Sequence, residues 1–235
     1  MKSLLTTTIL LLLSAPALLA GEKGDLFSGI PLIRHVPPKE YGASGQNWAV
    51  VQDRRGFLYF GNTEGLLEYD GVTWRLYPVP NGTVRSMTVS NSGVIFVGGI
   101  DEFGYLDTDQ KNRVRYRSLK GILPPGEQNF DDVWSIHSTD SLLIVQTFSR
   151  VFLIPVISEP ETDSILTGEV RILRTASVFF PACFFDHRFY VTEKNTGLLM
   201  LEGDRLVPVP GGELFAKDIV YMMLPYGDPG NGKAL

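Results

Sequence analysis

Three residues in the last quarter of the chain have the types needed for a nucleophile and its base. Cys183, Asp186 and His187 lie within five positions, and a Cys–His pair is a known catalytic arrangement. On a strand, however, residues four apart lie about 13 Å from one another. We therefore expect Asp186 and His187 to form a solvated hairpin turn. We expect Cys183, the only cysteine, to be a small buried apolar side chain, which excludes an internal disulfide.

Two other stretches match ion or phosphate sites only in part. Gly227–Lys233 has the spacing of a phosphate loop, but Ala234 stands where the Mg²⁺-binding hydroxyl is needed, so we expect a glycine-rich hairpin. Asp107–Asp109 opens like a calcium loop, but Lys111 occupies a ligand position, so we expect a surface turn. The three histidines form no ligand cluster. The sequence thus predicts no catalytic residue, no metal and no cofactor.

Polar residues at matched points of a repeat are better candidates for binding. They lie in three connections that we expect to open on one rim of the fold, where carboxylates and amides would converge. Such groups at a concave mouth suit a carbohydrate or another small hydroxylated ligand. The alternative, that these connections are ordinary solvated turns, stays open. The candidate residues are Asn62, Glu64, Asp101, Glu102, Lys194 and Asn195.

The elements that would position these residues repeat along the chain. A strand, a glycine-bounded turn and a second strand at Gly56–Gly71 return at Gly93–Leu106. Short apolar runs bounded by Gly, Asn, Asp or Pro continue to about residue 208, without a sustained helical period. The Asp70-Gly71 pair predicts a type I′ hairpin turn. Repeats of this size are typical of β-propeller blades.

The repeat divides the chain as follows. A signal peptide (1–20) and a lead-in segment (21–45) precede the propeller repeats (46–235). We place the blades at about 46–83, 84–121, 130–176 and 178–213, with part of a fifth at 214–235 that begins near Ile219–Leu224. The third unit carries an insertion, Ser158–Gly168, which we expect to be an exposed loop.

The apolar runs support this fold class. Phe57–Phe60 and Val94–Val97 do not alternate with polar residues, so these strands must be buried on both faces. A parallel α/β sheet would bury its strands in the same way, but the crossover helices that it needs are absent from the sequence pattern. We predict an all-β propeller of about four four-stranded blades plus part of a fifth, forming an incomplete ring.

The beginning of the chain indicates export. Lys2 precedes an apolar stretch, Leu4–Leu13, and Ala15, Ala17 and Ala20 offer small residues to a signal peptidase. An uncleaved membrane anchor over residues 3–21 is the alternative. The formal net charge of −5 and the lack of a basic cluster argue against nucleic-acid binding. We expect a periplasmic or otherwise extracytoplasmic protein.

Several motifs in the first two units resemble a known family. They are Tyr41–Trp48, Tyr59–Asn62, Gly65–Leu67, Tyr69–Gly71 and Trp74, followed by Val97–Gly99 and Glu102–Leu106. Together they resemble the periplasmic sensor region of two-component regulator propeller proteins. The resemblance extends from about Ile30 to Leu106 and thins after Gly121. It implies an exported propeller followed by an immunoglobulin-like domain, a membrane helix and a cytoplasmic output module such as a histidine kinase, a nucleotide cyclase or a transcription regulator.

We therefore expect a ligand-sensing propeller region of a bacterial signal-transduction protein. It would not be catalytic in itself, and the chain would be an amino-terminal fragment without the membrane and output parts. Two alternatives are an exported propeller enzyme acting on polysaccharides and a periplasmic protein-interaction module. A truncated propeller would expose a blade face and strand edges, so we also expect self-association.

Overall fold

The computed structural model describes residues 33–108, 114–159 and 164–224. Backbone contacts divide the chain into two units, Met1–His35 and Val36–Leu235, and every element below lies in the second. The predicted signal peptide, the alternative anchor over residues 3–21 and the Gly227–Lys233 motif lie outside the described residues. Within the described ranges, no helix has the length and apolar character needed to cross a membrane.

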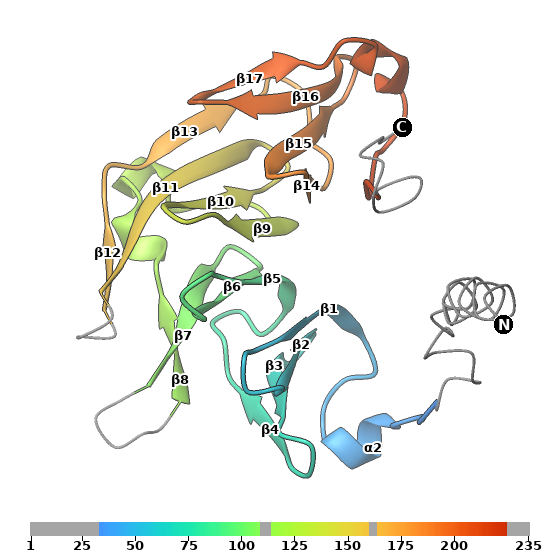
Figure 1. The fold of residues 1–235 in the computed structure, drawn as a ribbon, viewed down its shortest axis with the longest axis vertical. Helices are drawn as coiled ribbons and strands as arrows, with labels where there is room; N and C mark the ends of the chain where they lie inside the picture. Colours follow the sequence, from blue (N-terminus) through green and yellow to red (C-terminus); the bar gives the residue numbers. More distant parts are fainter. Residues whose placement is uncertain (1–32, 109–113, 160–163, 225–235) are drawn as a thin grey trace, which may run out of the picture. The chain divides into compact units, whose positions relative to one another are not determined.

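The described chain forms four antiparallel sheets, each made of strands that follow one another in sequence (Figure 1). The first sheet contains β1 (Asn47–Gln52), β2 (Leu58–Asn62), β3 (Gly65–Tyr69) and β4 (Trp74–Tyr77). The second contains β5 (Val84–Val89), β6 (Ile95–Gly99), β7 (Phe103–Thr108) and β8 (Val114–Ser118). The third contains β9 (Ser135–Ser138), β10 (Leu142–Gln146), β11 (Arg150–Glu159), β12 (Ser164–Thr167) and β13 (Arg171–Arg174). The fourth contains β14 (Cys183–Phe185), β15 (Arg188–Glu193), β16 (Gly197–Glu202) and β17 (Arg205–Pro208).

Helical structure is confined to short segments. The α-helix α2 (Pro38–Tyr41) precedes the first sheet, and its Tyr41 ring lies 5.5 Å from the ring of Trp74. The 3₁₀ helices η1 (Lys120–Ile122) and η2 (Pro125–Glu127) lie between the second and third sheets, and η3 (Gly212–Phe215) follows β17.

The first strands of neighbouring sheets lie side by side. Strand β1 contacts β5, and β5 contacts β9. Four-stranded meanders that meet along their first strands and stack face to face are blades of a β-propeller. The predicted fold class, an all-β propeller of about four blades, is confirmed.

Strand β6 is buried on both faces, as predicted from its unbroken apolar run. In β2, by contrast, Tyr59 is buried but Leu58 and Phe60 are only half-buried, so the prediction of burial on both faces is wrong there. In β6, Ile95 and Val97 pack with Tyr59 and Leu66 of the first sheet, and these four side chains belong to one core cluster. Phe96, which points the other way, packs in a second cluster with residues of the third sheet such as Phe152. A third cluster joins the third and fourth sheets. Each sheet is therefore stabilised chiefly by its neighbours.

Two predicted connections differ from the structure. The hairpin at Asp70-Gly71 is present, but its turn is not type I′, because Gly71 alone has positive φ (98°). The Asp70 carboxylate instead accepts hydrogen bonds from the amides of Val72 (3.0 Å) and Thr73 (2.7 Å), which makes a longer Asx-type turn. The insertion Ser158–Gly168 is not a plain loop: β11 continues to Glu159 and pairs with β12, so that the third sheet has five strands.

Two further expectations fall near the end of the chain. Asp186 and His187 form a two-residue hairpin turn with positive φ at both positions (48° and 59°), as predicted. Ile219–Leu224, where we expected a fifth blade to begin, forms no regular strand in the structure. The partial fifth blade stays a prediction.

Close approach between the second and third sheets requires a glycine at position 98. A Cβ atom there would lie 2.4 Å from Val133 Cγ1 and 2.6 Å from Ser86 Oγ. We predict that Gly98→Ala lowers the free energy of unfolding by about 1–3 kcal/mol. Gly121→Ala, where no atom lies within 4 Å of the added carbon, serves as the control. Urea unfolding followed by tryptophan fluorescence measures both, and equal stability of the two variants would contradict the close packing of these sheets.

Candidate functional site

Each of the first two sheets carries a bulge at the same point of its first strand. In β1, Asn47 pairs with Asn62 and Ala49 with Gly61, which leaves Trp48 as the extra residue. In β5, Arg85 is extra in the same way, because Val84 pairs with Gly99 and Ser86 with Gly98. A bulge redirects its side chain away from the regular pleat.

The third sheet presents an equivalent residue. The amide of Trp134 donates to the carbonyl of Gln146 (3.0 Å), which is also the ladder partner of Ser135, so two residues again oppose one. Trp48, Arg85 and Trp134 therefore occupy matched positions at the start of three neighbouring first strands. We call these three residues the inner-strand cluster.

The cluster side chains contact one another across the three sheets. The Arg85 guanidinium carbon lies 3.9 Å from the centre of the Trp48 ring and 5.1 Å from that of Trp134. The two indole rings are 6.4 Å apart at an interplanar angle of 81°. A cation held against two indoles is a favourable arrangement, worth about 0.5–2 kcal/mol for each contact.

Surrounding residues fix the orientation of the cluster. The Trp48 indole N–H donates to Thr63 Oγ1 (3.3 Å), and Arg85 Nε donates to Asp132 Oδ2 (2.9 Å). The Phe148 ring packs 5.2 Å from that of Trp134. Trp48 keeps 38% of its surface exposed, so the cluster reaches solvent. An aromatic surface beside a guanidinium and a carboxylate can bind a molecule that has both an apolar face and hydroxyl groups.

The rim residues predicted from sequence have several structural roles. Asn62 is fully buried, and its amide donates to the Ser44 carbonyl (2.6 Å) and to Asn47 Oδ1 (2.8 Å). The buried Glu102 carboxylate accepts from Ser118 Oγ (2.7 Å) and Tyr116 OH (3.1 Å). Burial and the neighbouring Glu102 charge raise the pKa of Tyr116. These side chains hold their own connections in place.

The other predicted rim residues are more accessible. Asp101 pairs with Lys120 Nζ (2.7 Å) and accepts from the Phe130 amide (2.9 Å). Glu64, Lys194 and Asn195 are exposed at the connections where we expected them. The structure gives no contact that joins the predicted residues of different sheets. A ligand-binding role for them stays a prediction.

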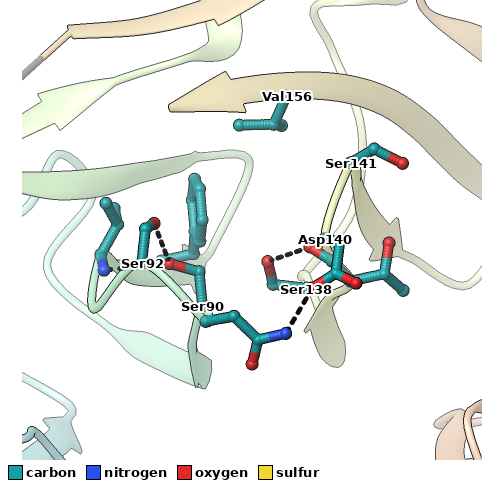
Figure 2. A pocket seen from close by; sticks show the side chains of 10 residues that line it. Ser90, Ser92, Ser138, Asp140, Ser141 and Val156 are labelled. Atoms are coloured by element: carbon teal, nitrogen blue, oxygen red, sulfur yellow. Dashed lines mark hydrogen bonds between the residues drawn. The ribbon is translucent and has the colours of Figure 1, made fainter. Parts of the chain in front are cut away.

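A hollow lies at the other end of the first strands. It has a volume of about 310 Å³ and lies between the turns that follow β5 and β9 (Figure 2). Ser90 and Ser92 lie on one side and Asp140 on the other; Asn91 donates to the Asp140 carboxylate across it. The Ser90 and Ser92 hydroxyls hydrogen-bond to each other (2.8 Å). These polar groups hydrogen-bond to one another and hold the two turns together, so they are less available to a ligand. The inner-strand cluster is therefore the stronger candidate for a binding site.

The remaining chemistry-bearing residues do not form a site. Cys183 is half-buried, and burial raises the pKa of its thiol, which disfavours the nucleophilic thiolate. The surface turn predicted to begin at Asp107 is wrong for its first two residues, because Asp107 and Thr108 lie in β7, where Asp107 pairs with Arg117 Nε (2.7 Å). In the part of the chain that the structure describes, no group of three or more His, Cys, Asp or Glu residues could hold a metal ion.

Comparison with known proteins gives fold likenesses only. No protein-family model and no curated protein matches this sequence. Among solved structures, a virginiamycin B lyase from Staphylococcus aureus has 13% identity and a TM-score of 0.49, over 68% of this chain and 54% of that one. A streptogramin B lyase has 14% identity and a TM-score of 0.47, over 71% and 56%. The extracellular domain of a putative one-component system from B. thetaiotaomicron has 14% identity and a TM-score of 0.48, over 76% and 24%.

The chain spans little more than half the length of the two lyases. At these identities the likenesses assign no activity or ligand to it.

The structure separates two of the predicted rim carboxylates by their contacts. Glu102→Ala removes a buried carboxylate and leaves the hydroxyls of the half-buried Tyr116 and the exposed Ser118 without their acceptor, so it should lower the free energy of unfolding by about 1–3 kcal/mol. Glu64→Ala changes an exposed side chain and should have an effect within about 0.5 kcal/mol. Chemical denaturation of both variants tests this difference. A Glu102→Ala variant as stable as the parent would contradict the structural role.

A buried histidine makes stability depend on pH. His137 packs against the rings of Phe184 and Phe189, and burial lowers its pKa to about 4, with a hydrogen bond to the Ala182 backbone opposing the shift. The folded state therefore disfavours the charged imidazole. Its contribution to stability is complete above the unfolded pKa of about 6.5 and is lost as pH falls toward 4.

We predict that His137→Gln reduces the loss of unfolding free energy between pH 7 and pH 4.5 by about 1–3 kcal/mol. His35→Gln, at an exposed position, is the control and should leave the pH profile unchanged. Denaturation curves at several pH values measure both. Parallel profiles for the parent and His137→Gln would show that this histidine is not the source of the acid sensitivity.

Proposed function

We propose that this chain is the extracytoplasmic ligand-sensing propeller region of a bacterial signal-transduction protein and is not catalytic in itself. Its ligand would bind at the inner-strand cluster. The observation that carries the proposal is the contact of Trp48, Arg85 and Trp134, which three different sheets contribute to one solvent-reaching surface.

The chemistry of the cluster favours a carbohydrate or another small hydroxylated ligand. An indole ring covers the apolar C–H face of a sugar, while the Arg85–Asp132 pair offers both donors and acceptors to hydroxyl groups. The ring of Trp48 is already held by Thr63, and Arg85 by Asp132. Less side-chain freedom would therefore be lost when a ligand binds.

Two further arguments support sensing over simple binding. The Tyr41–Trp74 motifs resemble the sensor region of two-component regulator propeller proteins, and the Lys2–Ala20 segment has the pattern of an export signal. In addition, a ligand on the cluster would contact side chains from three sheets at once, so it could bias how those sheets pack. A shift of this kind needs a ligand with different affinity for the two arrangements.

The binding test uses xylo-, manno-, fructo- and malto-oligosaccharides together with oligogalacturonides. We predict that at least one quenches tryptophan fluorescence and raises the melting temperature, and that Trp48→Ala weakens this binding about tenfold or more. Trp74→Phe is the control. Trp74 stacks on Tyr69 and lies outside both the inner-strand cluster and the core cluster that joins the first two sheets, so this variant should bind within about twofold of the parent. Release of reducing ends is followed in the same samples.

The results separate the candidate functions. Binding without sugar release supports the sensing propeller. Turnover of a bound oligosaccharide would show an exported enzyme instead, and no binding by any of the five oligosaccharide classes would contradict the proposal.

A further inference from the structure

The contacts of Arg85 and Asp132 point to a more specific ligand chemistry. Resting on the proposed function, we infer that the inner-strand cluster recognises two neighbouring hydroxyl groups of an uncharged sugar ring, with Arg85 and Asp132 binding the hydroxyls and Trp48 covering the ring face. Asp132 is then a specificity-determining residue.

The Arg85–Asp132 pair leaves part of each group available. One hydrogen bond, from Nε to Oδ2 (2.9 Å), joins the two side chains. Within the described ranges, the terminal nitrogens of Arg85 and Oδ1 of Asp132 form no hydrogen bond to protein. The side chains keep 16% and 20% of their surfaces exposed, respectively. The pair thus presents N–H donors beside a carboxylate acceptor.

Two adjacent hydroxyl groups match this pair. One hydroxyl can donate to Asp132 Oδ1 while its neighbour accepts from an Arg85 terminal N–H. Hydrogen bonds to charged groups are stronger than neutral ones, and an unmatched ligand would leave these groups without their solvent partners.

The local charges favour an uncharged ligand. Asp132 balances the charge of Arg85, and the exposed Asp131 directly precedes Asp132 in the sequence, with its carboxylate 3.4 Å from Ser149 Oγ. A carboxylate on the ligand would therefore meet at least as much negative as positive charge. This argues for neutral sugars over uronic acids at this site.

Trp48 supplies the surface against which the ring can pack. Its indole is 38% exposed although the guanidinium lies against the ring, and its N–H is bonded to Thr63. The apolar surface, the donors and the acceptor therefore lie next to one another, as a hydroxylated ring requires.

The test compares the neutral oligosaccharides above in two forms, untreated and after periodate cleavage followed by borohydride reduction. Periodate breaks the carbon–carbon bond between neighbouring hydroxyls, and the treatment adds no charge. We expect periodate treatment to weaken binding about tenfold or more, and Asp132→Asn and Arg85→Lys to weaken binding of the untreated form by a similar factor. Asp131→Asn, the adjacent carboxylate, should stay within about twofold. Thermal unfolding confirms that each variant is folded.

Each outcome bears on a different claim. Unchanged binding after periodate treatment, or in Asp132→Asn, would overturn the inference while leaving the sensing proposal in place. Tighter binding of oligogalacturonides than of every neutral oligosaccharide would overturn it as well. If no oligosaccharide binds the parent protein, the inference and the proposed function both fail. Should Asp132→Asn not fold, Arg85→Lys and the periodate comparison decide the question.

Discussion

The rest of this structure depends on the stacking of sheets through strands that are buried on both faces. Ile95 and Val97 pack toward the first sheet, and Phe96 packs toward the third. Removing apolar surface from water on both sides of one strand is the dominant favourable contribution to the folding free energy. Because the described chain has little helix, nearly all of this burial occurs between sheets. The same stacking leaves little space between sheets, which is why Gly98 lies against Val133.

The stacking also creates the candidate site. It places β1, β5 and β9 next to one another, and the bulges in the first two strands release Trp48 and Arg85 from the regular alternation of the pleat. Arg85 then lies between two indoles, with its charge balanced by Asp132. The site is thus a consequence of how neighbouring repeats meet. No single repeat contains it, so it would be lost if the sheets separated.

Much of the fold could be predicted from the sequence, because apolar runs bounded by glycine carry the strand signal locally. The predicted strand Val94–Val97 overlaps β6, and Asp186 and His187 form the predicted hairpin turn. The extension of β11 to Glu159 was missed, since the polar residues that follow resemble a loop and its strand partner lies beyond them. The turn at Asp70 differs because the Asp70 carboxylate accepts hydrogen bonds from the amides of Val72 and Thr73. The Asp-Gly pair alone does not indicate these side-chain contacts.

The candidate site was harder to predict for a physical reason. Polar loop residues are the obvious candidates for binding in a sequence. In the structure, however, Asn62 and Glu102 hydrogen-bond to nearby groups of the protein and stabilise their own connections. The cluster residues lie in three different repeats, so no local stretch of sequence contains the site. Their matched positions at the start of successive units were the available signal.

In the proposed site, Trp48 and Trp134 act together as one binding surface through Arg85. The most direct measurement follows the indole N–H resonances of the three tryptophans by NMR during titration with a bound oligosaccharide, with each resonance assigned by a single Trp→Phe variant. The account predicts that the Trp48 and Trp134 resonances shift with one common affinity while that of Trp74 stays in place. A shift of the Trp74 resonance alone, or different affinities at Trp48 and Trp134, would contradict it.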